Sequence, residues 1–145
     1  MKSGKSNSAA AMDKLSTQIT QFFSSPSFAV VGASDDPRKY GHKVFRCYLA
    51  HDKRAFPVNP NADMVLGHRA YKNLQSLPEH VESVSIITPP AVTDKIVDDA
   101  IANGVKNIWM QPGAEHPSAV KRAEERGLNV IHGGPCLLVV LGYRE

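Results

Sequence analysis

Five short apolar runs recur along the chain, and each is separated from the next by a longer stretch of mixed character. The runs contain Val, Ile, Phe and Trp and occupy residues 28–31, 54–58, 83–88, 107–110 and 128–131. The first of them, residues 28–31, is continuously apolar, which is typical of a strand that is buried on both faces of a parallel sheet. The pattern therefore predicts five parallel strands.

Apolar residues between the runs recur at the spacing of amphipathic helices. We expect helices over residues 13–25, from residue 40 onward, over 92–101 and over 117–126. Right-handed crossovers place such helices on both faces of the sheet, so the predicted fold class is α/β, a Rossmann-like open parallel sheet of five strands. Residues 137–141 add an apolar strand edge, through which the chain could form a homodimer.

The loop after the first run has the character of a phosphate cradle. Gly32 ends the run without a side chain, Ala33 and Ser34 are small, and a helix follows. The free N–H groups and the positive dipole end of a helix attract an anion, most often a phosphate. The dinucleotide fingerprint Gly-x-Gly-x-x-Gly would need glycines where this chain has Ser34 and Pro37. The loop therefore argues against a plain NAD site.

Four motifs follow one another at characteristic intervals. They are VGAS (31–34) with Pro37 and Gly41, PVNP (57–60), WMQPG (109–113), and GLNVI (127–131) leading to Cys136. Together they resemble the coenzyme A-binding domain, both the stand-alone family of small CoA-binding proteins and the nucleotide-binding half of the succinyl-CoA synthetase alpha subunit. The resemblance covers residues 13–141 and implies strand order 3-2-1-4-5, with the ligand beyond the carboxyl ends of the strands.

The end of the second run favours the same cofactor. Dinucleotide enzymes usually place Asp or Glu there to hold a ribose hydroxyl, whereas this chain has Asn59. A carboxylate would repel the ribose 3′-phosphate of coenzyme A, and an amide would not. We expect coenzyme A or an acyl-CoA as the cofactor. The alternatives are an NAD(P)-binding oxidoreductase or nicotinamide-sensing protein on the same fold, and an interaction module whose loop is only structural.

The loops at the carboxyl edge define one set of candidate cofactor-binding residues. Residues 32–34 would lie against the pyrophosphate, and the cations beside this loop would bind the extra phosphate of the cofactor. The residues that follow the later strands would border the adenosine and the pantetheine arm. The set is Gly32, Ala33, Ser34, Arg38, Lys39, Tyr40, Gly41, Val58, Asn59, Pro60, Thr88, Pro89, Pro90, Gln111, Gly113 and Cys136. His42 and Lys43 are further cations there. Cys136 would face the cofactor thiol, although a buried small hydrophobe is the simpler interpretation.

Composition limits the remaining classes of protein. The 145 residues, 42% of them hydrophobic, suit a single domain over residues 13–145 that follows a disordered tail over residues 1–12. No apolar stretch reaches the roughly 18 residues of a membrane span. Cys47 and Cys136 lie far apart and no secretory signal precedes them, which favours reduced thiols and a cytoplasmic location.

Charge and histidine content indicate small-molecule binding more than other activities. The net charge of +3 is dispersed and forms no basic run with aromatic residues, so no nucleic-acid partner is expected. The six histidines lack metal-ligand spacing, and His116 is interpreted as a helix cap. The related synthetase needs a further domain with a phosphorylated histidine and a partner subunit. We therefore expect a binding module with no catalytic residue.

Overall fold

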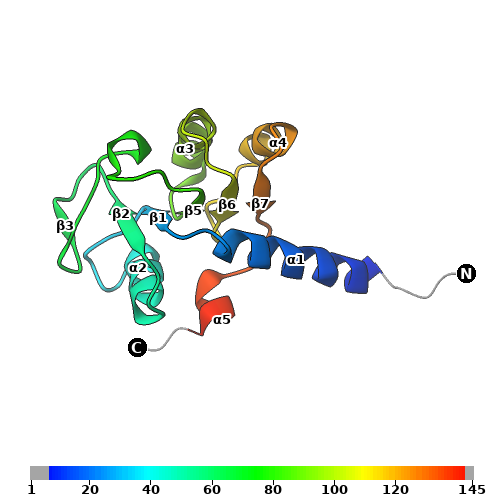
Figure 1. The fold of residues 1–145 in the computed structure, drawn as a ribbon, viewed down its shortest axis with the longest axis horizontal. Helices are drawn as coiled ribbons and strands as arrows, with labels where there is room; N and C mark the ends of the chain where they lie inside the picture. The colour runs from blue at the N-terminus through cyan, green and yellow to red at the C-terminus, as the bar shows by residue number, and fades with distance from the viewer. Residues whose placement is uncertain (1–6, 143–145) are drawn as a thin grey trace, which may run out of the picture.

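A parallel sheet forms the middle layer of the computed structural model, which describes residues 7–142, with side chains from residue 13. Helices pack on both faces of this sheet (Figure 1). Its strands are β1 (Phe28–Val31), β2 (Ala55–Val58), β5 (Ser83–Ile86), β6 (Asn107–Met110) and β7 (Asn129–Ile131). Each strand lies within one of the five apolar runs, so the predicted α/β fold class is confirmed.

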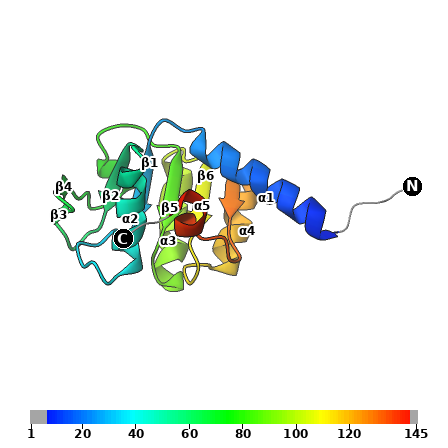
Figure 2. The same cartoon turned by 90° about the horizontal axis from the view of Figure 1, so that it is seen from below.

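The two faces of the sheet carry separate cores, because side chains alternate along each strand. Phe28 and Val30 face one core, whereas Ala29 and Val31 face the other. The first core is covered by α1 (Asn7–Phe23), α2 (Tyr40–Ala50) and α5 (Leu137–Leu141) (Figure 2). The second is covered by the 3-10 helix η1 (Leu74–Ser76), α3 (Pro90–Ala102) and α4 (Pro117–Glu125). Within residues 7–142, no helix has the length and apolar character needed to cross a membrane.

The strand order corrects the expectation drawn from the resemblance. The observed order is β2-β1-β5-β6-β7, so the third long strand lies beside the first and the order 3-2-1-4-5 is wrong. The place beyond β2 is taken by Tyr71 alone, which forms an isolated parallel bridge with Val58. A short antiparallel pair, β3 (Met64–Val65) and β4 (His68–Arg69), precedes Tyr71.

The physical reason for this order is the face on which each connection crosses the sheet. The connection from β1 to β2 contains α2 and covers the first core, whereas the connection from β2 to β5 contributes Leu74 and Val81 to the second core. A right-handed crossover on the opposite face moves the chain in the opposite direction. The strand β5 is therefore placed beside β1, and the strand order reverses between these two strands.

Two local predictions also differ from the structure. The disordered tail was expected over residues 1–12, but helix α1 begins at Asn7, so residues 7–12 are helical; residues 1–6 lie outside the described residues. Residues 137–141 form helix α5 and not a strand edge, which removes the basis of the expected homodimer. Leu137 is fully buried while Val139 is 80% exposed. Packing of one face against α2 therefore outweighs the strand preference of the paired valines.

Close backbone contact joins β1, β5 and the start of α2. A Cβ atom built on Gly41 would lie 1.9 Å from the carbonyl oxygen of Gly32. A Cβ atom on Gly32 would lie 1.9 Å from the carbonyl oxygen of Ile87, and Gly32 has a positive φ of 96°. No side chain fits at either position, because neighbouring backbone atoms are too close. The contact between Gly41 and Gly32 therefore sets where α2 begins.

We predict that Gly41→Ala destabilises the fold. Alanine is favoured over glycine inside a helix by about 1 kcal/mol. Here the added methyl group meets the Gly32 carbonyl, and overpacking of this kind costs about 1–3 kcal/mol. Urea denaturation measures the change in the free energy of unfolding.

The exposed position 46 in the same helix provides the control. Arg46→Ala should be more stable than Arg46→Gly by about 1 kcal/mol, because only helix propensity differs there. A stabilising Gly41→Ala substitution would show that the close contact carries no weight.

Candidate functional site

The turns after β1 and β5 meet at the carboxyl edge of the sheet, where the strand order reverses. The N–H of Gly32 donates to the Val58 carbonyl at 3.0 Å, and the N–H of Ile87 donates to the Val31 carbonyl at 2.8 Å. These bonds extend the sheet beyond the ends of the strands. In open α/β sheets, ligands bind in the crevice at such a reversal point.

The N-terminus of α2 opens onto this edge with unpaired donors. Lys39 is the N-cap residue, and no side chain caps the helix. Within residues 7–142, the N–H groups of Tyr40 and Gly41 have no acceptor, and the first turn carries no acidic residue. Because the dipole end is uncompensated and two donors are free, this terminus is suited to an anion.

The charged residues of the loop divide into one paired and one unpaired cation. Asp36 accepts from the Arg38 side chain at 3.0 and 2.9 Å, and these bonds lower the pKa of the Asp36 carboxyl to about 2. The Arg38 side chain is 88% exposed. Lys39 forms no ion pair within the described chain, although its charge lies near enough to Asp36 to help lower the pKa of that carboxyl. Lys39 is therefore the available cation at the start of α2, and Arg38 is available only if it leaves Asp36.

Several polar side chains of the loop hold its shape. The Ser34 hydroxyl accepts from the N–H of Asp36 at 3.1 Å, and the Ser34 carbonyl lies 3.0 Å from Nδ1 of His42. Because a carbonyl oxygen can only accept a hydrogen bond, Nδ1 of His42 is the nitrogen that carries the proton. His42 is only 6% exposed, so it supports the loop and is not one of the free cations that the sequence suggested. The Asp35 carboxylate accepts from Leu66 at 2.9 Å and ties the loop to the β3–β4 pair.

The residues after β2 are also tied to the loop. Nδ2 of Asn59 donates to the Ala33 carbonyl at 2.8 Å, and Oδ1 of Asn59 accepts from the N–H of Asn61 at 2.8 Å. The Asn59 amide is thus used at both ends. Val58 is buried, whereas Pro60 is exposed, so the side chain of Pro60 faces solvent beside the loop.

A second cluster joins the start of α2 to the ends of β6 and β7. The Tyr40 hydroxyl lies 3.1 Å from Oε1 of Gln111 and 2.6 Å from Sγ of Cys136. Oε1 of Gln111 also accepts from the N–H of Leu137 at 2.9 Å. Burial, followed by the hydrogen bond to Cys136, raises the pKa of Tyr40. Nε2 of Gln111 is buried without a partner in the described part of the chain, so one donor of this cluster is left unsatisfied.

The remaining candidates form the starts of α3 and α4. The Thr88 hydroxyl pairs with the Thr93 hydroxyl at 2.8 Å, and Pro89 and Pro90 are the N-cap and first residue of α3. The N–H of Gly113 donates to Glu115 at 2.9 Å. These hydrogen bonds connect residues that are near in sequence, so they do not link these two loops to the loop after β1.

His116 caps α4, because its Nδ1 accepts from the N–H of Ala119 at 3.1 Å, which confirms the interpretation of this residue. Among the described residues, no group of three His, Cys, Asp or Glu side chains is placed to hold a metal ion. The sequence did not indicate that Ile87 and Leu66 hold this edge in place, Ile87 through its bond to Val31 and Leu66 through its bond to Asp35. Both act through backbone atoms, which leave no signal in residue type.

The fold and this edge define a doubly wound α/β domain of the class that binds nucleotide cofactors where the strand order reverses. The family model of the CoA binding domain matches residues 26–142. The chain belongs to this family.

The chain is similar to several known proteins. The alpha subunit of an ADP-forming acetate–CoA ligase II from Pyrococcus furiosus is 32% identical over 117 residues, which are 79% of this chain and 26% of that subunit. The uncharacterized protein YneT of Bacillus subtilis is 26% identical, over 74% of this chain and 79% of its own. The solved structure of a conserved hypothetical protein from Pyrococcus furiosus has a TM-score of 0.74 and 33% identity, over 79% of this chain and 97% of that one. The chain thus spans about a quarter of the ligase subunit.

We predict that Arg38→Ala returns the pKa of Asp36 from about 2 toward 3.8. Because the pKa of Asp36 is lower in the folded chain than in the unfolded chain, the Asp36–Arg38 pair stabilises the folded state at pH values above the pKa of the unfolded chain. This contribution is lost as the pH falls from about 4 toward 2. The pair is exposed, so added salt should weaken the effect. Titration of the Asp36 carboxyl carbon by NMR measures the pKa directly.

Arg54→Ala is the matched control, since Arg54 holds another exposed carboxylate, Glu79, and lowers its pKa. This variant should change the titration of Glu79 and leave that of Asp36 in place. An unchanged Asp36 titration in Arg38→Ala would assign the low pKa to another cause.

Proposed function

We propose that the chain binds coenzyme A or an acyl-CoA at the carboxyl edge between β1 and β5, as a binding module without ligase activity. The observation that carries the proposal is the uncapped N-terminus of α2, which presents the free N–H groups of Tyr40 and Gly41 beside the Gly32 turn. Two free donors at a positive dipole end suit the pyrophosphate of the cofactor.

The cations beside this terminus are assigned to the phosphates. Lys39 meets the pyrophosphate or the ribose 3′-phosphate directly, because it forms no ion pair in the described chain and the carboxylate near it, Asp36, is already bound by Arg38. Arg38 exchanges Asp36 for a phosphate, and a phosphate offers the same bidentate geometry as a carboxylate. Neutral residues Val58, Asn59 and Pro60 border the adenosine, where a carboxylate would repel the 3′-phosphate.

The pantetheine arm is assigned to the loops that follow along the same edge. Thr88, Pro89 and Pro90 border it first, and Gln111 and Gly113 come next. The unsatisfied Nε2 of Gln111 is a donor that fits an amide carbonyl of the arm. Cys136, in contact with the Tyr40 hydroxyl, is the residue proposed to lie toward the cofactor thiol.

The relatives also support the proposal. One of them is named as a subunit of an ADP-forming acetate–CoA ligase, and the present chain matches only about a quarter of it. Cofactor binding is therefore the part of that activity proposed here. None of the described residues is assigned a catalytic role.

We predict that coenzyme A stabilises the protein and that NAD does so much less. Ligand at about 100 times its dissociation constant adds roughly 2.7 kcal/mol of stability. This corresponds to a shift of several degrees in the melting temperature of a domain of this size. Thermal denaturation with coenzyme A, 3′-dephospho-CoA, NAD or NADP measures the shifts. A shift with NAD equal to that with coenzyme A would overturn the assignment of the cofactor.

Lys39→Ala is predicted to weaken coenzyme A binding by about 1–3 kcal/mol, because it removes a charge-assisted contact with phosphate. The loss should be smaller at high salt, which screens exposed charges. Titration calorimetry at low and high salt measures it. Lys106→Ala is the control, since Lys106 lies at the amino edge of the sheet and pairs with Glu82 at 3.2 Å. Equal affinities for the two variants would remove Lys39 from the site.

A further inference from the structure

A groove of about 460 Å³ follows the outer edge of β2, away from the carboxyl edge described above. One wall comes from the turn between α2 and β2, the floor is β2 itself, and the other wall comes from β4 and Tyr71. The residues that line this β2-edge groove are Leu49, Asp52, Lys53, Arg54, Ala55, Phe56, Pro57, His68, Arg69 and Tyr71. The groove runs along the open side of an edge strand.

Backbone groups in the floor of the groove are free to bind an extended chain. Along β2, Arg54 and Val58 direct their carbonyls to β1, so the intervening odd-numbered residues direct theirs outward. The outward carbonyl of Pro57 accepts from Tyr71 at 2.9 Å. The N–H and carbonyl of Ala55 have no partner beyond β2 within residues 7–142. The edge is thus covered at its carboxyl end and open at Ala55.

Arginine side chains already cover the aromatic rings in the groove. The Arg54 guanidinium lies 5.2 Å from the centre of the Phe56 ring, and that of Arg69 lies 5.6 Å from the centre of the Tyr71 ring. The two rings contact each other edge to face at 6.0 Å. Nucleic-acid bases would need these ring faces for stacking. Arginine that stacks on an aromatic ring keeps its N–H donors available to carboxylates.

The charges of the groove are unbalanced in favour of cations. Arg54 already holds a carboxylate of its own chain, as its Nε lies 2.9 Å from Oε1 of Glu79. Arg69 and Lys53 have no carboxylate partner in the described part of the chain. Arg69 lies over the Tyr71 ring of the groove, whereas the Lys53 ammonium lies 5.2 Å from the centre of the Phe23 ring of α1, outside the groove. Asp52 is the acidic residue among those that line the groove.

We propose that the β2-edge groove binds an extended acidic segment of a partner protein. The segment pairs its backbone with Ala55 as a short added strand, and its Asp or Glu side chains bind Arg69 and Lys53. A second copy of this chain would bring the same cations face to face, and like charges disfavour that pairing. The proposal does not depend on the proposed cofactor site, because the two sites share no residue.

Titration of isotope-labelled protein with an acetylated peptide of alternating Glu and Val tests this inference. The amide signal of Ala55 should shift, and calorimetry should give a dissociation constant that rises with salt. Arg69→Glu and Lys53→Glu should each weaken binding about tenfold or more, because each replaces an attraction with a repulsion. Coenzyme A binding should be unchanged in both variants, so loss of peptide binding is distinguished from failure of the cofactor site.

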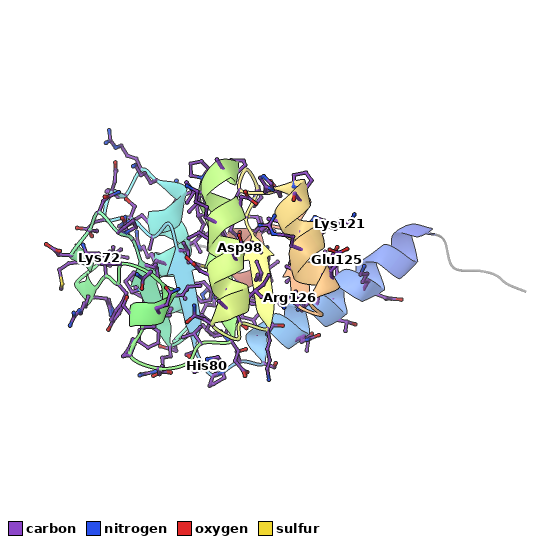
Figure 3. All side chains as sticks on the ribbon, turned by 90° about the horizontal axis from the view of Figure 1, so that it is seen from above. Lys72, His80, Asp98, Lys121, Glu125 and Arg126 are labelled. Atoms are coloured by element: carbon purple, nitrogen blue, oxygen red, sulfur yellow. The ribbon has the colours of Figure 1, made fainter. Side chains whose placement is uncertain are left out.

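Lys121→Glu is the matched control, since Lys121 lies on α4, at the other end of the molecule from Lys72 and the β3–β4 pair (Figure 3). This variant should bind the peptide as the unaltered protein does. Peptides of alternating Lys and Val, and the acidic peptide with N-methylated backbone, should not bind. No shift of the Ala55 amide with the acidic peptide, or equal binding of the basic peptide, would overturn the proposal. Single-stranded RNA that binds and loses its binding in Arg69→Glu would assign the groove to nucleic acid instead.

Discussion

The close backbone contact among Gly32, Gly41 and Ile87 is the constraint on which the rest of the site depends. It brings the end of β1, the start of α2 and the end of β5 closer together than any Cβ atom would permit. Because α2 starts directly on the strand end, its free N–H groups open onto the point where strand order reverses. A looser junction would move the helix dipole away from that crevice.

Polar residues at this edge mostly build the loop, and fewer of them are free for a ligand. The Ser34 hydroxyl, the Asn59 amide and the His42 ring all bond to nearby backbone. Burying such groups without partners would be costly, so their mutual pairing gives the loop one shape. The groups left over are backbone donors, Lys39 and one amide nitrogen of Gln111. An anion site of this kind depends on a rigid backbone more than on many charged side chains.

The two edges of the sheet are protected in different ways. At β7, the Gln18 side chain of α1 donates to the Val130 carbonyl at 2.9 Å, and Asn129 donates to the Gln18 carbonyl at 2.9 Å. This helix closes one edge against pairing with other chains. At β2, Pro57 and the bridge from Tyr71 cover only part of the edge, and cations flank the rest. The second edge therefore has cations beside it and no covering helix, and it stays open at Ala55.

The sequence by itself determined the elements and the chemistry of the loop, because apolar periodicity and glycine positions are local properties. The five strands, the helix from Tyr40 and the missing fingerprint glycines are all visible in residue order. Which loop residues are free was not visible, since the pairing of Arg38 with Asp36 and of Asn59 with Ala33 needs the folded loop. Tertiary structure also decided the position of β5 and the helical state of Leu137–Leu141. Both depend on the face of the sheet against which a segment packs, and that is a property of the assembled layers.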